Sequence, residues 1–226
     1  MALKAQFLIR MSLGAIVLPA ALFGCAGSVK FWQGWAWMAV FIIPFLAFHV
    51  YLYRHDPKLL ERRMRLKEKI SAQRLVQVAG PLIFLTCFVL CGLDYRFGWS
   101  AAVLWPVPVW LTLLSDAWVL GGVLLIAGVM RVNSFAARTI QVEAGQPVVS
   151  SGPYSFVRHP MYLGAAMISL ANPLALASWI ALPVSALLLP ALVLRLLGEE
   201  RFLRRELPGY SEYCLRTRFR LVPLIW

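Results

Sequence analysis

Ionisable and aromatic side chains gather in three short segments of the second half of the chain. The segments are Arg158-His159-Pro160-Met161-Tyr162-Leu163-Gly164, Glu199-Glu200, and Leu207-Pro208-Gly209-Tyr210-Ser211-Glu212-Tyr213. Each segment lies beside an apolar run. A charge next to a membrane is costly unless it has a partner, so these residues are candidates for a functional site.

The first segment suits the binding of an anionic group. Pro160 occupies the position at which proline starts a helix, so Arg158 and His159 fall just outside the positive end of that helix. An arginine at the end of a membrane span also suits contact with lipid phosphate. Both interpretations of Arg158 stay open.

The other two segments add acidic and phenolic groups. Glu199 and Glu200 suit either a cationic group of a ligand, through charge-assisted hydrogen bonds, or a structural pairing with the arginines that follow them. Tyr210 and Tyr213 suit either this site or aromatic anchoring at a membrane interface.

A polar loop leads into the Arg-His-Pro segment. Residues 138–142 alternate in polarity, and residues 143–147 and 151–154 have the composition of turns. Loops on a rigid scaffold often present binding groups, so we expect this loop to contribute to the site.

The composition predicts an integral membrane protein with an all-α fold. Hydrophobic residues make up 61% of the chain, which has nine Trp and a mean hydropathy of +0.73. A membrane span needs about 20 apolar residues. We therefore expect a polytopic helix bundle of about six spans, at residues 7–26, 34–53, 76–94, 108–131, 160–176 and 178–197.

Two of these spans allow alternatives. Residues 99–131 form one apolar stretch with Pro106, Pro108 and Asp116, so they are either a span with an interfacial lead-in or a re-entrant segment. Asn172-Pro173 is a turn signal and predicts a tight hairpin between the last two spans. If these spans instead form one bent helix, the number falls to five.

The basic residues predict the orientation. All of the 22 Lys and Arg except Lys30 and Arg96 fall on one side of the six-span arrangement. This bias places both termini and the polar segments in the cytoplasm, as in a multi-pass protein of a bacterial inner membrane. The charge therefore reports topology and attraction to membrane lipids, and no motif indicates nucleic-acid binding.

The chain divides into two parts. Residues 1–130 form N-terminal transmembrane helices, with a basic interfacial helix at about 57–70 that Asp56 and Pro57 start. A solvated connector is the alternative for that helix. Residues 131–226 form the second part, with the hairpin and a C-terminal tail. The four cysteines have no metal-ligand spacing, so no metal is expected.

The C-terminal part resembles a known family. Arg-His-Pro-x-Tyr-x-Gly at 158–164, Asn172-Pro173, Glu199-Glu200-x-x-Leu203 and the Pro-Gly-Tyr-x-x-Tyr tail are similar to the isoprenylcysteine carboxyl methyltransferase and phospholipid methyltransferase superfamily, in its bacterial-type members. The resemblance covers roughly residues 138–223, and it implies that residues 131–226 are a methyltransferase-like, cofactor-binding core with a cytoplasmic C-terminal segment. It implies a methyltransferase that uses S-adenosylmethionine without a Rossmann domain, and the chain indeed has no G-x-G-x-x-G motif.

The resemblance also implies site residues. Gln146 to Val149 match a strand-like segment along the cofactor, although the eukaryotic members often have His at the position of Gln146. The predicted cofactor-binding residues are Gln146, Val148, Val149, Gly152, Tyr154, His159, Tyr162, Gly164, Glu199, Glu200 and Tyr210.

The acceptor is expected to be a lipophilic or membrane-partitioned small molecule. A carboxylate acceptor is already ionised at neutral pH, so it needs only orientation, for which Arg158 is the candidate. An amine or thiol would need a base, for which Glu200 or Tyr213 is the candidate. The catalytic candidates are thus Arg158, Glu200 and Tyr213, and the acceptor and oligomeric state stay open.

Two other classes of function compete with this hypothesis. An NADPH-dependent membrane reductase of the sterol-reductase type has a similar helical layout, but more basic residues around its cofactor would be expected. A non-enzymatic membrane or transport component would leave the Arg-His-Pro and Glu-Glu segments without a common ligand.

Overall fold

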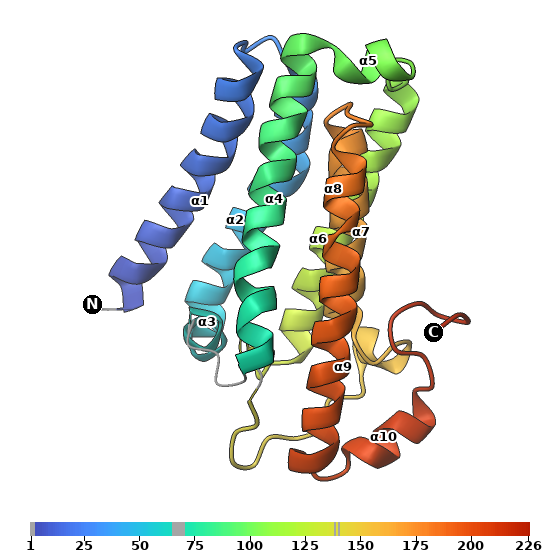
Figure 1. Ribbon diagram of the computed structural model, residues 1–226. Helices are drawn as coiled ribbons and strands as arrows, with labels where there is room; N and C mark the ends of the chain where they lie inside the picture. Colours follow the sequence, from blue (N-terminus) through green and yellow to red (C-terminus); the bar gives the residue numbers. More distant parts are fainter. Residues whose placement is uncertain (1–2, 65–70, 138, 140) are drawn as a thin grey trace.

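The computed structural model describes residues 3–64, 71–137, 139 and 141–226, and these residues form a bundle of helices without any strand (Figure 1). The helices are α1 (Leu3–Ala26), α2 (Trp32–His55), α3 (Pro57–Met64), α4 (Ser71–Phe97), α5 (Trp99–Val103), α6 (Val109–Val132), η1 (Gly152–Ser155), α7 (Pro160–Ala175), α8 (Leu182–Ala186), α9 (Leu188–Glu206) and α10 (Tyr210–Arg216).

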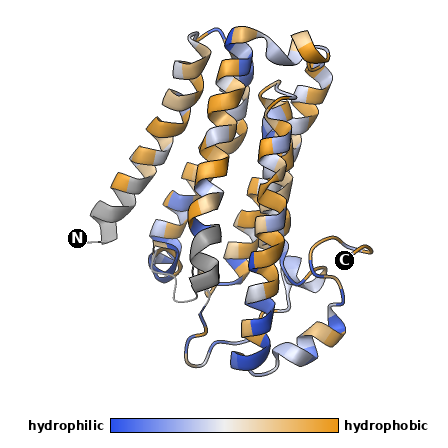
Figure 2. Ribbon diagram, in the orientation of Figure 1, coloured by the Kyte–Doolittle hydropathy of each residue, from blue (hydrophilic) through white to orange (hydrophobic). Residues whose placement is uncertain are grey.

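The predicted class, a polytopic helical membrane protein, is confirmed. Within the described residues four helical segments are long and apolar enough to cross a membrane: Trp32–His55, Gln77–Phe97, Val109–Val132 and Leu182–Glu206. The apolar segment Met11–Ala26 and helix α7, of 16 residues, are shorter. Figure 2 shows hydrophobic residues along most of the bundle and hydrophilic ones gathered near the lower ends of α2 and α9.

Exposed aromatic residues mark the two ends of the bundle. Trp35, Trp99 and Trp110 are exposed where α2, α5 and α6 begin, and we call this the tryptophan end. Tyr51 and Tyr53 are exposed near the other end of α2. From Trp35 to Tyr53 the helix rises about 27 Å, close to the ~30 Å thickness of a hydrocarbon core. The exposed tryptophans and the exposed tyrosines therefore suit the two membrane–water interfaces.

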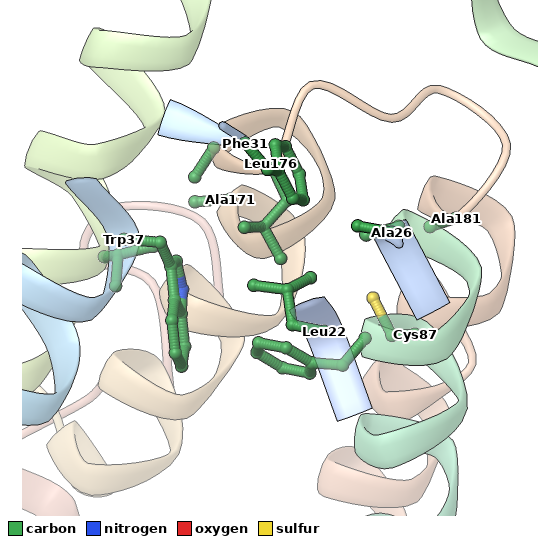
Figure 3. Packing of buried hydrophobic residues seen from close by; sticks show 12 residues of the cluster. Leu22, Ala26, Phe31, Trp37, Cys87, Ala171, Leu176 and Ala181 are labelled. Carbon is green, nitrogen blue, oxygen red and sulfur yellow. The ribbon is translucent and has the colours of Figure 1, made fainter. Parts of the chain in front are cut away.

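The main apolar core lies toward the tryptophan end. Figure 3 shows how its side chains pack. Trp37 packs edge-on against Phe88 at 4.6 Å between ring centroids, and Leu22 and Leu176 are almost fully buried beside them. Cys87 and Cys91 belong to the same cluster, as small apolar core residues do. This core fastens α1, α2, α4 and α7 together at one end.

Helices α6 and α7 approach each other closely at two glycines. A Cβ atom on Gly164 would lie 2.8 Å from the carbonyl oxygen of Gly122, and a Cβ atom on Gly122 would lie 2.8 Å from that of Gly164. Only glycine fits at both positions without a shift of the backbone. The contact fixes α7, whose N-terminal end carries the Arg-His-Pro segment.

The predicted hairpin is present, but its turn was placed wrongly. Asn172 and Pro173 lie inside the last turns of α7, and the chain reverses over residues 176–181. The Nε1 atom of Trp37 donates a hydrogen bond of 2.7 Å to the side-chain oxygen of the fully buried Asn172. This contact with a distant helix keeps Asn172 in the core. A tertiary contact of this kind overrides the local preference of the Asn-Pro pair for a turn.

For the other helices, the structure decides between two alternatives and confirms one local prediction. Residues 99–131 form a short lead-in, α5, followed by one long helix, α6, rather than a re-entrant segment. Asp56 accepts a hydrogen bond of 2.9 Å from the backbone N–H of Leu59 and so caps α3, which Pro57 starts. Residues 65–70 of the predicted interfacial helix, and residues 138 and 140 of the loop, lie outside the described residues.

Helix α3 turns its apolar side chains toward the protein. Leu59 and Leu60 are buried, Leu59 against side chains of α2 and α6. Arg62 forms a two-point ion pair with Glu143, at 2.9 and 2.6 Å. Arg63 donates to the carbonyl oxygen of Ala136 at 3.1 Å. These contacts tie α3 to the polar loop.

Candidate functional site

A cavity of about 380 Å³ opens at the end of the bundle opposite the tryptophan end, which we call the site end. Its polar part is lined by the loop, the start of α7, α9 and the tail, with Asn133, Gln141, Gln146, Tyr154, His159, Tyr162, Glu199 and Tyr210. Its apolar part lies between α4, α6, α7 and α9, with Gly80, Pro81, Ile126, Met161, Ala165, Leu188, Ala191 and Leu192. The cavity is therefore amphipathic, as a site for a polar and a lipophilic ligand must be.

Most of the predicted site residues line this cavity. They are Gln146, Val148, Val149, Tyr154, Arg158, His159, Tyr162, Glu199, Tyr210 and Tyr213. Gly152, Gly164 and Glu200 are not among the lining residues. Gly152 has a φ of +59°, in the left-handed region that favours glycine, and it forms the turn of η1. Gly164 makes the helix contact described above.

Glu199 faces the cavity together with Tyr162. The hydroxyl of Tyr162 donates a hydrogen bond of 2.5 Å to the carboxylate of Glu199. One turn earlier on α9, Arg195 also lines the cavity. A carboxylate oriented in this way at the wall of a cavity can accept hydrogen bonds from a cationic group.

Glu200 faces away from the cavity, and we call it and its four basic partners the Glu200 cluster. Its carboxylate lies 3.2 Å from Arg158, 3.5 Å from His159 Nε2, 2.9 Å from Arg204 and 3.1 Å from Arg220. The Glu200 residue is only 3% exposed. A buried carboxylate with this many donors is satisfied by the protein itself.

Arg158 holds the C-terminal tail. Its Nη1 atom donates to the backbone carbonyl oxygens of Thr217 and Arg218, both at 3.1 Å, and more weakly to that of Cys214 at 3.4 Å. The backbone N–H of Arg158 donates to Phe219 at 2.9 Å. The Arg158 side chain is 6% exposed. Arg158 thus links the start of α7 to the segment after α10.

Tyrosine hydroxyls join the tail to the loop. Tyr213 donates a hydrogen bond of 2.7 Å to the carbonyl oxygen of Tyr154, whose own hydroxyl accepts one of 2.8 Å from Asn133. Burial raises the pKa of Tyr154 to about 12 and raises the pKa of Tyr213 as well. Both phenols are therefore protonated at neutral pH and act as hydrogen-bond donors or acceptors.

Several buried side-chain atoms on the cavity wall make no hydrogen bond within the described residues, and those of Tyr210 and Gln141 are two of them. The hydroxyl of Tyr210, a residue 4% exposed, makes no hydrogen bond, and neither does the side-chain nitrogen of Gln141. Burial also raises the pKa of Tyr210. Unpaired buried polar atoms are uncommon in native structures, so they mark positions where a ligand can bind.

Several lining residues were not predicted from the sequence. Arg63 and Gln77 come from α3 and α4, and Asn133, Phe135, Thr139 and Gln141 come from the loop. The loop had been assigned to the site as a whole, so its polar residues could have been included. Arg63 carried no such signal, because it looked like one of many basic residues on a surface helix.

The described residues contain no group of three or more His, Cys, Asp or Glu side chains that could hold a metal ion. The loop segment 146–149, predicted to be strand-like, has no strand assigned to it.

Fold and site together define an integral membrane protein with an amphipathic cavity at one end of its helix bundle. The model of the isoprenylcysteine carboxyl methyltransferase (ICMT) family matches residues 111–205, which supports the predicted family. The family and the fold support a membrane methyltransferase. No curated protein matches the chain.

The match begins within α6 and ends within α9. It contains Arg158, His159, Tyr162, Glu199 and Glu200. The cavity residues from α3 and α4, and those of the C-terminal tail, lie outside the matched region.

Proposed function

We propose that this protein transfers a methyl group from S-adenosylmethionine to a lipophilic acceptor. The observation that carries the proposal is the continuity of the cavity: its polar part, with Glu199 and Tyr210, leads directly into an apolar part beside Leu188 and Leu192. A polar sulfonium cofactor and an apolar acceptor need such adjacent surroundings.

The residues present suit this cofactor. Glu199 offers a carboxylate to the ammonium group, and the unpaired Tyr210 hydroxyl and Gln141 nitrogen offer hydrogen bonds to its other polar atoms. Val148 and Val149 give an apolar wall. When bound, the cofactor supplies a sulfonium-activated methyl group.

The protein's task in such a transfer is alignment. An in-line displacement requires donor and acceptor atoms at near-attack distance with water excluded. His159 and Tyr162 lie at the start of α7, and the Gly122–Gly164 contact fixes that helix. We therefore assign them to positioning the cofactor against the acceptor.

The contacts favour an acceptor that needs no general base. Glu200 is surrounded by four basic side chains, and Tyr213 is protonated and donates to a backbone carbonyl. Neither suits proton abstraction from an amine or thiol. Of the three acceptor classes, a carboxylate is the one already ionised at neutral pH.

We place the acceptor in the apolar part of the cavity, with its polar group next to Arg63 and Gln77. These polar side chains line the cavity, as does Arg195. Guanidinium groups pair well with a carboxylate. The lipophilic portion would then lie between α4 and α9, where Pro81 is exposed at the bundle surface.

We further propose that the site end faces the cytoplasm. Apart from Lys30 and Arg96, the basic residues of the sequence belong to the site-end parts of the helices or to the segments that join them there. This distribution agrees with the positive-inside bias.

A ligand-binding measurement tests the function. S-adenosylhomocysteine should raise the unfolding temperature of the purified protein, and NADPH should not, because a ligand that binds only the folded state stabilises it by mass action. Methyl transfer from radiolabelled cofactor to a lipid extract should follow. Stabilisation by NADPH alone would point to a reductase, and stabilisation by neither would remove the cofactor assignment.

A further inference from the structure

The C-terminal tail ends in an ordered turn that exposes two aliphatic side chains. The backbone N–H groups of Leu221 and Val222 donate to the carbonyl oxygen of Trp226, at 2.8 and 3.1 Å, and the N–H of Trp226 donates back to Val222 at 3.1 Å. Within this turn Leu224 is 86% and Ile225 is 80% exposed. Two neighbouring aliphatic side chains exposed to this degree are suited to contact with a partner or with lipid.

The turn is attached to the Glu200 cluster. The guanidinium of Arg220 lies 5.5 Å from the centre of the Trp226 ring and also pairs with Glu200 at 3.1 Å. The backbone N–H of His159 donates to Arg220 at 2.9 Å. The position of the turn is therefore fixed relative to the start of α7.

The turn lies at the level where the bundle leaves the membrane. After α10 the chain runs back along the bundle, so that in Figure 1 the C-terminus lies at the height of α3 and the end of α2. This is the level of the exposed Tyr51 and Tyr53. Figure 2 shows the end of the chain in the hydrophobic colour at that level, well above α10.

The charges of the tail suit an anionic surface. Arg216 and Arg218 are exposed, and residues 213–226 contain no acidic side chain. Basic side chains beside exposed aliphatic ones are the pattern of segments that insert into the boundary of headgroups and acyl chains.

We propose that the turn of residues 221–226 inserts Leu224 and Ile225 into the membrane leaflet at the site end, with Arg216 and Arg218 contacting anionic lipid headgroups. The membrane then becomes a second anchor of the tail that carries Tyr210 and Tyr213 to the cavity. This inference does not rest on the methyl-transfer function, because it concerns the outer surface of the tail.

A fluorescent label tests the insertion. Ile225→Cys and, as a matched control, Ser211→Cys are each made in the full chain carrying Cys25→Ser and labelled with an environment-sensitive dye; Cys87, Cys91 and Cys214 are buried. Ser211 is exposed at the start of α10. The Cys25→Ser protein without an added cysteine measures any background labelling. The proteins are placed in vesicles of phosphatidylcholine alone or mixed with phosphatidylglycerol.

The dye at position 225 should be quenched by lipids carrying a nitroxide and be several-fold less accessible to aqueous iodide than the dye at position 211. Adding phosphatidylglycerol should increase this protection, and Arg216→Gln with Arg218→Gln should remove the increase. Equal iodide quenching at the two positions would overturn the proposal. So would protection from iodide without quenching by lipid, because the turn would then be covered by protein.

Discussion

The hydroxyl of Tyr162 donates a hydrogen bond of 2.5 Å to Glu199, and this bond distinguishes Glu199 from the glutamate beside it. Successive residues of a helix point about 100° apart, so Glu199 lines the cavity while Glu200 turns toward Arg158 and Arg220. The adjacent acidic residues therefore have separate surroundings, and substitutions of each should give separate effects.

Glu199→Gln should weaken the binding of S-adenosylhomocysteine while leaving the protein folded. The loss of a hydrogen bond to a charged group costs roughly 1.5–3 kcal/mol, or about 10- to 100-fold in affinity. Titration calorimetry of the purified variant measures this directly. An unchanged dissociation constant would contradict the assignment of Glu199 to the cofactor.

The main effect of Glu200→Gln should be a lower thermal stability of the protein. Removing one partner of a buried ion pair costs on the order of 3–5 kcal/mol, here by leaving Arg158 buried without its carboxylate. Glu206→Gln is the control, because Glu206 is an exposed glutamate of the same helix. Thermal unfolding of the two variants should differ clearly, and equal unfolding temperatures would rule out the Glu200 cluster as a stabilising feature.

Arg158→Lys should lower thermal stability and cofactor affinity together. A lysine keeps the charge, but its compact ammonium group cannot reach the carbonyl oxygens of Thr217 and Arg218 in the same planar geometry. The tail that carries Tyr210 would then be held less firmly. If methyl transfer fell while binding of S-adenosylhomocysteine stayed intact, Arg158 would instead contact the acceptor.

Arg63→Gln should raise the KM for a lipophilic carboxylate such as an isoprenylated cysteine, by about 10- to 100-fold if one charged hydrogen bond is lost. The affinity for S-adenosylhomocysteine should not change. Arg54→Gln is a suitable control, because Arg54 is exposed in the last turn of α2. Equal KM values in both variants would place the acceptor's polar group elsewhere in the cavity.

Single cysteines should report the orientation proposed from the basic residues. With the four native cysteines removed, a cysteine at position 30 or 96 should react only with reagent added outside the cytoplasm. Positions 54 and 218 should react only from the cytoplasmic side. Labelling of position 96 from the cytoplasmic side would require a different number of spans before it.

Residue type was sufficient to predict helix starts and caps, because these depend on contacts between near neighbours in the sequence. Pro160 starts α7 and Asp56 caps α3, as their residue types predict. The fold class followed from the composition, because apolar runs of about 20 residues are long enough to cross a membrane as helices. These features depend little on distant parts of the chain.

The sequence did not predict local structure or side-chain orientation that depends on contacts with residues far away in the chain. The hydrogen bond from Trp37 places Asn172 within a helix, and no pattern near Asn172 reports it. The partners of Glu200 come from α7, α9 and the tail, so Glu199 and Glu200 looked equivalent in the sequence. The site assignments themselves stay predictions that the substitutions above must test.

The glycine contact between α6 and α7 restricts which substitutions the site can tolerate. A methyl group at position 164 would meet the Gly122 carbonyl oxygen at 2.8 Å, so α7 would have to move as a unit. Tyr162 is only two residues away and its bond to Glu199 would lengthen or break. A single added carbon atom outside the cavity should therefore reduce ligand affinity. Neither Gly122 nor Gly164 should tolerate substitution, even though neither residue lines the cavity.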